Sequence, residues 1–516
     1  MNGQTAVVIG AGIGGLATAG RLARAGYRVT VVEKAARAGG RAGKIDREGY
    51  QFDTGPTLFL MPQIFAETYA ALGERMEDHL QLERIEPTYR IHFEEGTRLD
   101  LTGNMKQLQA QLEAIEPGSF AQALRYIGEG AGAMDLSVKK FVGRNFDSYL
   151  DYFSLANLPL IFKLKALVKH YDNVSSYFKD NRLRRAFSFQ NMYLGLSPYD
   201  APATYSLLQY TELADGIHFP RGGMYRIIET LQAIDEKLGV RFRFNAPAQS
   251  IDVTGDRTTG VTLATGEKLA ADLVVANADL PYVYSELLPD DGSAARLKQS
   301  KFTSSALMFY WGVDKQYPQL LHHNVFLAGD YKASFDRIFK DLTLPDDPSF
   351  YLCIASRTDA GMAPAGKDGI MALVPVGHLN EHAPQDWAAL RERARETIFA
   401  RLAQIGIHDL RENIRFEETF GPPDYRDQLN LVKGAAFGLS HNFTQVGYLR
   451  PHNQHARYKN LYFAGASTHP GTGLPIVLLS ARLTTERILK DALVTRRNRS
   501  DVESPRAASA PGVAAE

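Results

Sequence analysis

Alternating apolar runs and glycine-rich breaks divide the start of the chain into a strand, a helix and a second strand. The run 5–9 consists of strand-forming residues and ends at a cluster of glycines, which a helix of small residues follows. A second apolar run, 28–32, ends at Glu33. This order predicts a βαβ unit with the glycine spacing of a dinucleotide-binding site.

Three glycines of this unit have separate physical roles. Gly10 permits the tight turn, and Gly12 lets the backbone approach a pyrophosphate because a Cβ there would fill the space. Gly15 lets the helix pack close to the strand, and the helix N-terminus directs unpaired N–H groups at the phosphates. Glu33 is placed to accept hydrogen bonds from ribose hydroxyls and to repel a 2′-phosphate, which disfavours NADP. The alternative is a glycine-rich turn that binds no ligand.

A further flexible segment with a cation, Gly39, Gly40 and Arg41, follows the second strand. Such a segment can hold a second part of a long cofactor, and FAD is longer than a simple nucleotide. Spacing alone does not distinguish FAD from NAD.

Hydrophobic periodicity predicts the remaining elements. We expect helices at 61–72, 105–115, 120–140, 387–405 and 476–489, and one that begins near 224 and ends near 238. We expect strands at 89–93, 98–101, 240–244, 248–253, 260–264, 273–276, 306–313, 350–354 and 461–466. The strand 273–276 is followed by Asn277 and Asp279, at the edge where open α/β sheets bind ligands.

This order of elements predicts an α/β fold in which one domain interrupts another. We expect a Rossmann-type nucleotide-binding domain built from 1–85, 218–295 and 455–492. An inserted α+β substrate-binding domain is expected to comprise 86–217 and 296–454. The tail 493–516 is expected to be disordered, because it is rich in Arg, Ser, Pro and Ala and has no apolar period.

The charge balance and the single cysteine exclude several classes of protein. The 516 residues include 58 Lys plus Arg and 58 Asp plus Glu, so no net field attracts nucleic acid. Cys353 is the only cysteine, which excludes a disulfide framework and a thiol–disulfide flavoenzyme, and we expect it to be buried and structural. No signal peptide or membrane-spanning run is evident, so we expect a cytoplasmic protein unless it rests on a membrane surface.

The segment 152–169, within a helical region at 144–210, is apolar but carries three lysines. It is too short and too charged to span a bilayer. It could lie in the membrane interface with its lysines reaching the headgroups, which would make this region membrane-facing. The alternative is a buried helix covered by lysine stems.

Two other clusters are candidates for chemistry. On a helix, Asp180 and Arg184 would share a face and form an ion pair, which is either a solvated salt bridge or, beside a pocket, an acid/base group with its charge partner. His322 and His323 are adjacent, but no third ligand has metal-binding spacing, so we expect no metal site.

Several motifs together resemble the carotenoid desaturases of bacteria and fungi, the phytoene desaturase family within the amine-oxidase-like flavoproteins. The motifs run in family order from residue 5 to about residue 490: GAGIGGLATAGRLARAGYRVTVVEK with GGRAG, FDTGPTLF, SYFKDNRLRRAFSF, FPRGGM, YRDQLN, GAAFGLSHNF, YLRPHN and NLYFAGASTHPGTGLPIVLLSA. The first is shared by many flavoproteins, whereas the last is more specific to these desaturases.

The resemblance implies one FAD per chain, a long hydrophobic tunnel for a polyene, and attachment to the membrane in which the polyene dissolves. It implies that FAD is held by Gly10, Gly12, Ile13, Gly14, Gly15, Glu33, Lys34, Gly40, Arg41, Gly55, Pro56, Thr57, Val253, Gly465, Ala466, Gly473, Leu474, Pro475 and Ile476.

The resemblance also implies the reaction: a hydride leaves an allylic carbon of phytoene or a related linear carotenoid for the flavin, and a proton leaves the neighbouring carbon. We propose Asp180 as the base, kept ionised by Arg184. Oxygen or a membrane quinone is the expected electron acceptor, because only one nucleotide-binding motif is present. The alternatives are an amine oxidase, a carotenoid isomerase or saturase, and a flavin-free relative that binds prenylated proteins.

Overall fold

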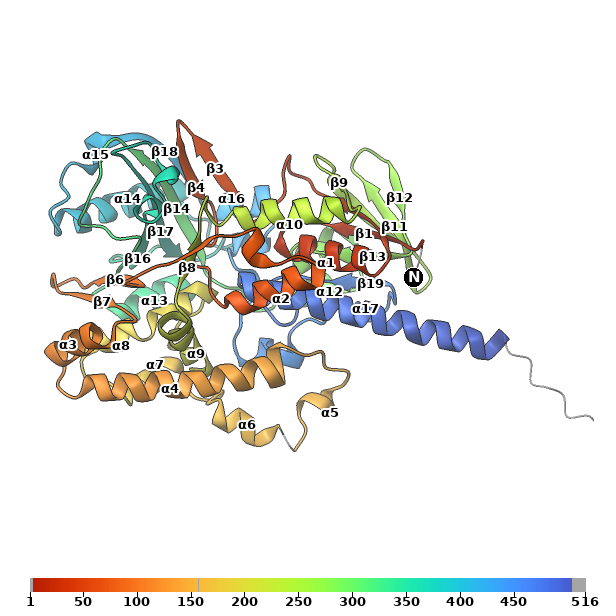
Figure 1. Cartoon of the computed structure of the whole chain (residues 1–516), viewed down its shortest axis with the longest axis horizontal. Helices are drawn as coiled ribbons and strands as arrows, with labels where there is room; N and C mark the ends of the chain where they lie inside the picture. The colour runs from red at the N-terminus through yellow and green to blue at the C-terminus, as the bar shows by residue number, and fades with distance from the viewer. Residues whose placement is uncertain (1–2, 156, 504–516) are drawn as a thin grey trace, which may run out of the picture.

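The computed structural model describes residues 3–155 and 157–503, and its architecture is built around two sheets (Figure 1). The first is a five-stranded parallel sheet with the strand order β19-β13-β1-β2-β9. Its strands are β1 (Thr5–Ile9), β2 (Arg28–Val32), β9 (Arg241–Arg243), β13 (Leu273–Ala276) and β19 (Leu461–Phe463). The predicted bounds of β1, β2 and β13 agree with the structure. Ile9 pairs with Val32 on one side and Ala276 on the other, so three strands end at one edge.

Four helices pack together beside this sheet, and α1 lies directly against β1 and β2. They are α1 (Ile13–Arg24), α2 (Pro62–Leu72), α10 (Arg226–Lys237) and α17 (Leu474–Glu503). In Figure 1, α1 lies among α2, α10 and α17. Nine of its twelve residues are buried, which the small residues of its sequence make possible.

Three small sheets flank this part of the molecule. They consist of β10 (Ala248–Thr254), β11 (Arg257–Leu263) and β12 (Lys268–Ala270); β3 (Lys44–Arg47) and β4 (Tyr50–Asp53); and β5 (Leu82–Arg84) and β8 (His218–Pro220). The remaining elements near them are α11 (Leu280–Tyr282), α12 (Ser293–Lys298) and α16 (Pro422–Leu429).

The second sheet has seven strands in the order β18-β14-β17-β16-β15-β6-β7. The strands are β6 (Tyr89–His92), β7 (Arg98–Leu101), β14 (Ser305–Val313), β15 (His323–Phe326), β16 (Phe350–Cys353), β17 (Asp368–Val376) and β18 (Ile414–Phe420). The expected hairpin of β6 and β7 is present. β14 is buried along its whole length because both of its faces are covered. Trp311 packs on one face with Ile398 of α14 (Trp387–Ala403), whereas Tyr310 packs on the other.

A layer of helices lies beside this sheet, below it in Figure 1. It contains α3 (Met105–Ile115), α4 (Ser119–Ser137), α5 (Tyr149–Tyr152), α6 (Leu158–Lys163), α7 (His170–Ser175), α8 (Asn181–Ala186), α9 (Leu207–Tyr210) and α13 (Tyr331–Phe339). No helix within the described ranges is long and apolar enough to cross a membrane.

Two expectations about helices are corrected. The expected helix at 120–140 leaves α-helical geometry after Ser137 and continues as a π-helical turn, Val138–Val142. The expected disorder of 493–516 is wrong for 493–503, because α17 continues through this polar sequence to Glu503. Residues 504–516 lie outside the described residues.

Candidate cofactor and substrate site

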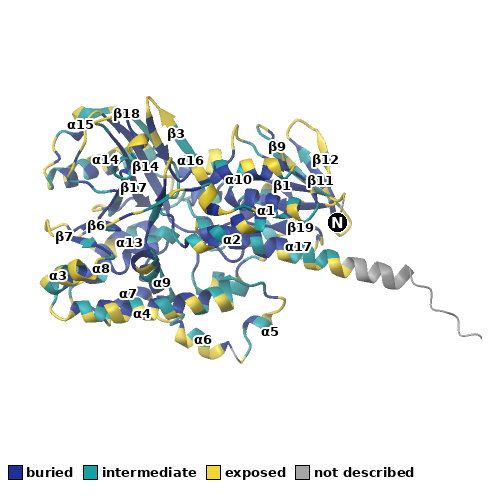
Figure 2. Cartoon of the chain, viewed as in Figure 1, coloured by how far each residue is buried: buried dark blue, intermediate teal, exposed yellow. Residues whose placement is uncertain are grey.

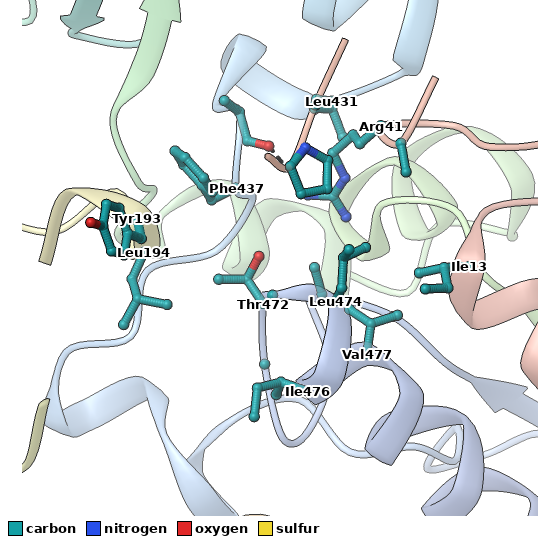
Figure 3. A pocket seen from close by; sticks show the side chains of 18 of the residues that line it. Ile13, Arg41, Tyr193, Leu194, Leu431, Phe437, Thr472, Leu474, Ile476 and Val477 are labelled. Carbon is teal, nitrogen blue, oxygen red and sulfur yellow. Dashed lines mark hydrogen bonds between the residues drawn. The ribbon is translucent and has the colours of Figure 1, made fainter. Parts of the chain in front are cut away.

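A cavity of about 1030 Å³ joins the glycine turn after β1 to the helical layer. One end is lined by backbone and small residues, and the other by aliphatic and aromatic side chains. In Figure 3, Ile13 and Arg41 lie on one side of it, Tyr193 and Leu194 lie on the opposite side, and Phe437 and Thr472 lie between them.

The glycine turn places the N-terminus of α1 at the cavity wall. Gly10 has a φ of +97°, which glycine adopts without strain, and Gly12 is the N-cap of α1. No acidic residue lies in the first turn of α1, so its N–H groups and positive dipole end favour an anion. The second glycine segment lies alongside, because Gly39 N–H donates to Ala11 O at 2.9 Å.

These segments pack closely against one another because several of their residues are glycines, which have no side chain. A Cβ on Gly15 would lie 2.0 Å from Gly10 O, and a Cβ on Gly14 would lie 2.6 Å from Asn277 Nδ2. A Cβ on Gly55 would lie 1.9 Å from Arg41 O. A larger residue at Gly15 or Gly55 would therefore displace backbone of the cavity wall, and one at Gly14 would displace the Asn277 side chain.

Glu33 lines the cavity at the end of β2, as expected for a residue that contacts ribose. Its carboxylate also accepts hydrogen bonds from Ala11 N–H at 2.8 Å and Ala35 N–H at 2.9 Å. A carboxylate offers about four acceptor sites, so these two bonds leave capacity for ribose hydroxyls. Glu33 thus fixes the loops on both sides of the nucleotide end.

Two cations line the same end of the cavity. Arg41 donates to Ala436 O at 3.3 Å and makes no ion pair with any residue in the described ranges. Its burial lowers the pKa of the guanidinium from its usual value. Lys34 donates to Asn430 Oδ1 at 2.6 Å. A half-buried guanidinium that has no salt bridge within the described residues and lies beside a helix N-terminus fits the pyrophosphate of a dinucleotide.

The loop before α17 closes the cavity from the opposite end of the chain. Arg450 is buried and holds this loop, since its guanidinium donates to Ala466 O at 2.5 Å and Thr468 O at 2.9 Å. His441, also on the cavity wall, accepts from Thr472 N–H at 3.0 Å. The sequence motifs contain Arg450 and His441, but only the folded chain shows that they position this loop.

Most residues predicted to hold the cofactor lie on this one wall. They are Gly10, Gly12, Ile13, Gly14, Glu33, Lys34, Gly40, Arg41, Gly55, Pro56, Thr57, Gly465, Ala466, Gly473, Leu474, Pro475 and Ile476. Gly15 lies one layer behind it, against Gly10. Val253 does not line the cavity, because it lies farther along β10; Pro247 and Ala248, at the start of that strand, do.

Asn277 and Asp279, at the end of β13, also lie on the cavity wall. Asn277 Nδ2 donates to Ala464 O at 2.8 Å, which ties the β13 edge to the β19 loop. Asp279 is buried and accepts hydrogen bonds from Ser467 Oγ and, at 3.2 Å, from Val432 N–H. The expectation that this strand end meets a ligand site agrees with their position.

The expected ion pair between Asp180 and Arg184 is wrong. Asp180 is the N-cap of α8 and its backbone carbonyl accepts from Arg184 N–H at 3.1 Å, but its side chain turns back to accept from Arg182 N–H at 2.8 Å. Its carboxylate binds Arg182 at 2.7 Å, whereas Arg184 Nε donates to Phe178 O at 2.8 Å. Neither Asp180 nor Arg184 is among the residues that line the cavity.

The far end of the cavity is apolar. It is lined by Met134, Val138, Phe141, Val142, Tyr152, Ile161, Leu164, Phe189, Met192, Tyr193, Leu194, Val325, Leu327, Tyr331, Phe335 and Ile338. Because most of these residues offer no hydrogen bond to a ligand, the space fits a hydrocarbon better than a polar amine.

A buried carboxyl group lies directly behind this lining. Glu212 is fully buried in the π-helical turn Thr211–Asp215 and accepts hydrogen bonds from Gln190 Nε2 at 3.1 Å and Tyr89 OH at 3.4 Å. Burial raises its pKa to about 8, and the hydrogen bonds oppose that shift. No pattern in the sequence indicated this cluster.

The structure brings a third possible donor, Cys353, to the adjacent histidines, although spacing along the sequence indicated none. Cys353 is buried, as expected, and its sulfur lies close to both imidazoles. The strands β15 and β16 pair antiparallel and bring these residues together from separate parts of the sequence.

A flavin dinucleotide fits the glycine cradle, by which we mean the turn Gly10–Gly15 together with Gly39 and Gly40, and it also fits the α1 N-terminus and Arg41. Comparison with known proteins supports the same cofactor. The chain belongs to the family described as flavin-containing amine oxidoreductase, whose model matches residues 13–489. The prediction of a flavin cofactor is therefore confirmed.

Within this family the chain is similar to phytoene desaturases. It is 47% identical to the zeta-carotene-forming phytoene desaturase of Myxococcus xanthus, over 94% of each chain. It is 42% identical to the phytoene desaturase of Phycomyces blakesleeanus, over 93% of this chain and 84% of that protein. It is 34% identical to the 4,4′-diapophytoene desaturase of Staphylococcus aureus, over 94% of this chain and 98% of that protein.

Solved structures share the fold at low sequence identity. An oxidoreductase from Methanosarcina mazei superimposes with a TM-score of 0.61 at 18% identity, over 93% of this chain and 100% of that chain. A putrescine oxidase bound to putrescine gives a TM-score of 0.61 at 16% identity, over 96% and 99% of the two chains. The mixed α/β fold is thus that of flavin amine-oxidase-like proteins.

Proposed function

We propose that the chain is an FAD-dependent carotenoid desaturase that introduces C=C bonds into phytoene or a related linear carotenoid. The observation that carries this proposal is the single cavity that joins a dinucleotide cradle to an apolar chamber. An amine oxidase needs polar groups around its amine, which this chamber mostly lacks. The phytoene desaturase relatives support the same substrate class.

The nucleotide end of FAD is assigned to the Rossmann-type unit formed by β1, α1 and β2. The N-terminus of α1 and Arg41 bind the pyrophosphate, and Glu33 accepts from the ribose. The five strands of the first sheet come from 1–85, 218–295 and 455–492, which we propose as one FAD-binding domain. The segments 86–217 and 296–454 form the substrate-binding domain.

Bound FAD supplies a two-electron acceptor for the hydride that leaves the polyene. The chain's own contribution is to hold the polyene straight in the apolar chamber and to exclude water from the reacting carbons. Asp180 lies outside the cavity lining, so we assign it the role of helix cap rather than that of base.

We further propose that the surface around α5 and α6 docks on a membrane. Seven of the twelve exposed large apolar side chains in the described ranges lie between 149 and 168, and this surface appears exposed in Figure 2. They are Tyr149, Leu150, Leu155, Leu158, Phe162, Leu167 and Val168. This concentration is typical of a membrane or partner surface.

Some side chains of the segment 149–168 that are not exposed face the cavity. Tyr152, Ile161 and Leu164 line the cavity, so a hydrocarbon has a short route from a lipid phase to the chamber. The three lysines of the segment differ in exposure and partners. Lys163 and Lys169 are exposed, whereas Lys165 forms a salt bridge with Glu129 at 2.6 Å. Oxygen or a membrane quinone is the proposed electron acceptor at this surface.

Expression of the chain in cells that make only phytoene tests the function. We expect coloured, more unsaturated carotenoids in the extract and a flavin spectrum from the purified protein. Unchanged phytoene together with a flavin spectrum would contradict phytoene as substrate, whereas an isomerase or saturase would change a coloured carotenoid without adding double bonds. A protein that cannot bind FAD would overturn the desaturase proposal and favour a flavin-free lipid-binding role.

A further inference from the structure

Three buried donor atoms meet in the second sheet, outside the FAD cradle. One ring nitrogen of His322, one of His323 and the sulfur of Cys353 lie within 4.8 Å of one another. His323 pairs directly with Cys353 across β15 and β16, and Cys353 pairs with Met371 on β17. Directly paired residues of neighbouring strands project to the same face, so His323, Cys353 and Met371 form one row.

The two imidazoles are each held through one nitrogen. His322 Nδ1 bonds Thr358 Oγ1 at 2.6 Å, and His323 Nδ1 bonds Tyr351 OH at 2.7 Å. Their Nε2 atoms are buried and have no hydrogen-bond partner among the described residues. When Nδ1 donates its hydrogen, Nε2 keeps a lone pair, and this is the arrangement by which outer-shell groups orient metal-bound histidines.

Leaving these nitrogens unpartnered is costly. A buried polar group without a partner is destabilising, and here two such groups belong to imidazole rings that contact each other. The His322 ring packs on Phe219, with 4.9 Å between ring centroids, and the His323 ring packs on Tyr89, with 5.6 Å between ring centroids. These contacts pack the rings but give neither Nε2 atom a hydrogen bond. One cation bound by both nitrogens and by the Cys353 sulfur, which also contacts the Tyr351 hydroxyl, would satisfy both nitrogens.

We propose that His322 Nε2, His323 Nε2 and Cys353 Sγ bind one Zn²⁺ ion. Two imidazoles and a thiolate suit zinc and other soft cations and do not suit Mg²⁺ or Ca²⁺, which prefer oxygen ligands. A separate void of about 10 Å³ lies on the Cys353 side of this cluster; Cys353, Asp53 and Met371 line it, and neither histidine does.

The site would brace the wall of the main cavity. The hydroxyl of Tyr351 bridges His323 Nδ1 and, at 2.9 Å, Thr57 Oγ1, and both Tyr351 and Thr57 line that cavity. A metal that fixes His323 therefore also fixes this hydroxyl pair. The inference does not depend on the identity of the substrate.

The test uses the full-length protein loaded with FAD. It is dialysed against Zn²⁺ and then against metal-free buffer, after which zinc is measured by mass spectrometry and flavin by absorbance. We expect about one zinc per chain in the wild type, and less than a tenth of that in Cys353→Ser and in His323→Gln. The X-ray absorption of the wild-type zinc should show one sulfur at about 2.3 Å and nitrogen at about 2.0–2.1 Å.

His92→Gln is the matched control. His92 lies in β6 of the same sheet, is buried, and also has an Nε2 without a partner in the described part of the chain. The His92→Gln variant should retain about one zinc per chain if the ion is bound by His322, His323 and Cys353. Wild-type zinc below a tenth per chain, or bound zinc without a sulfur neighbour, would overturn the proposal. The absorption measurement needs no variant, so it decides even if a substituted chain fails to fold.

Discussion

A Cβ on Gly15 would lie 2.0 Å from the carbonyl oxygen of Gly10, because α1 packs directly on the turn that leaves β1. Gly15→Ala must therefore push α1 away from the glycine turn. Overpacking of this kind costs about 1–3 kcal/mol, and it moves the N–H groups that face the pyrophosphate. We expect a lower melting temperature and at least about tenfold weaker FAD binding, measured by flavin titration of the apoprotein.

Gly132→Ala is the control for this variant. Gly132 lies in α4, and a Cβ there would have no atom within 4 Å. Alanine in a helix is favoured over glycine by about 0.5–1 kcal/mol, so this variant should be slightly more stable and bind FAD normally. Equal FAD affinity in Gly15→Ala and Gly132→Ala would show that close packing on Gly10 is not needed for the cradle.

Local patterns allowed the dinucleotide-binding turn to be predicted from the sequence, because its parts are close in the chain, whereas FAD rather than NAD came from the family resemblance. The run 5–9, the glycines and Glu33 follow one another within a single βαβ unit, and their spacing is set by backbone geometry. The strand bounds Thr5–Ile9 and Arg28–Val32 agree with the prediction for that reason.

Other parts of the site depend on contacts between distant segments. Arg450 binds carbonyls of the loop before α17, and Cys353 reaches His323 only through strand pairing. Periodicity within a segment carries no information about such contacts. The Asp180–Arg184 pair was mispredicted for a related reason: Asp180 is an N-cap, and the carboxylate of an N-cap turns back toward the first backbone N–H groups, here to Arg182, instead of along the helix face.

Asp180→Asn tests whether this carboxylate takes part in the chemistry. Asparagine caps helices about as well as aspartate, so stability should change by less than about 1 kcal/mol. Because Asp180 lies outside the cavity lining, we expect flavin reduction by the carotenoid to change less than about twofold in stopped-flow absorbance. A general base contributes about 10²–10⁴-fold, so a decrease of that size would restore Asp180 as the base.

Leu155→Gln combined with Phe162→Gln tests the membrane surface. Leu155 is 88% exposed and Phe162 is 67% exposed, so neither change should disturb the core. Loss of one inserted apolar side chain costs about 1.5–3 kcal/mol, which predicts at least about tenfold weaker vesicle binding per residue in a flotation assay. FAD content should not change.

Met105→Gln is the control for that surface, since Met105 is 41% exposed on α3, away from α5 and α6 in Figure 1. Its vesicle binding should equal that of the wild type. If the double variant floats with vesicles as well as Met105→Gln does, the surface around α6 is not the docking site.

Glu212→Gln tests the buried carboxyl group behind the substrate chamber through the pH dependence of stability. The pKa of Glu212 is raised from about 4.5 when unfolded to about 8 when folded, so between these values the folded chain binds more protons than the unfolded chain. The stability of the wild type therefore falls as pH rises through this window, by about 1.4 kcal/mol per pH unit from this one group. Glutamine does not titrate, so the variant lacks this loss.

Melting temperatures of both proteins at pH 4.5, 6, 7 and 8 give the comparison. All other titrating groups are common to both chains, so their contributions cancel in the difference between them. We expect the difference to move steadily in favour of Glu212→Gln from pH 4.5 to pH 8. A difference that stays constant across this range would mean that Glu212 is ionised in the folded protein, in which case its hydrogen bonds with Tyr89 and Gln190 outweigh the cost of its burial.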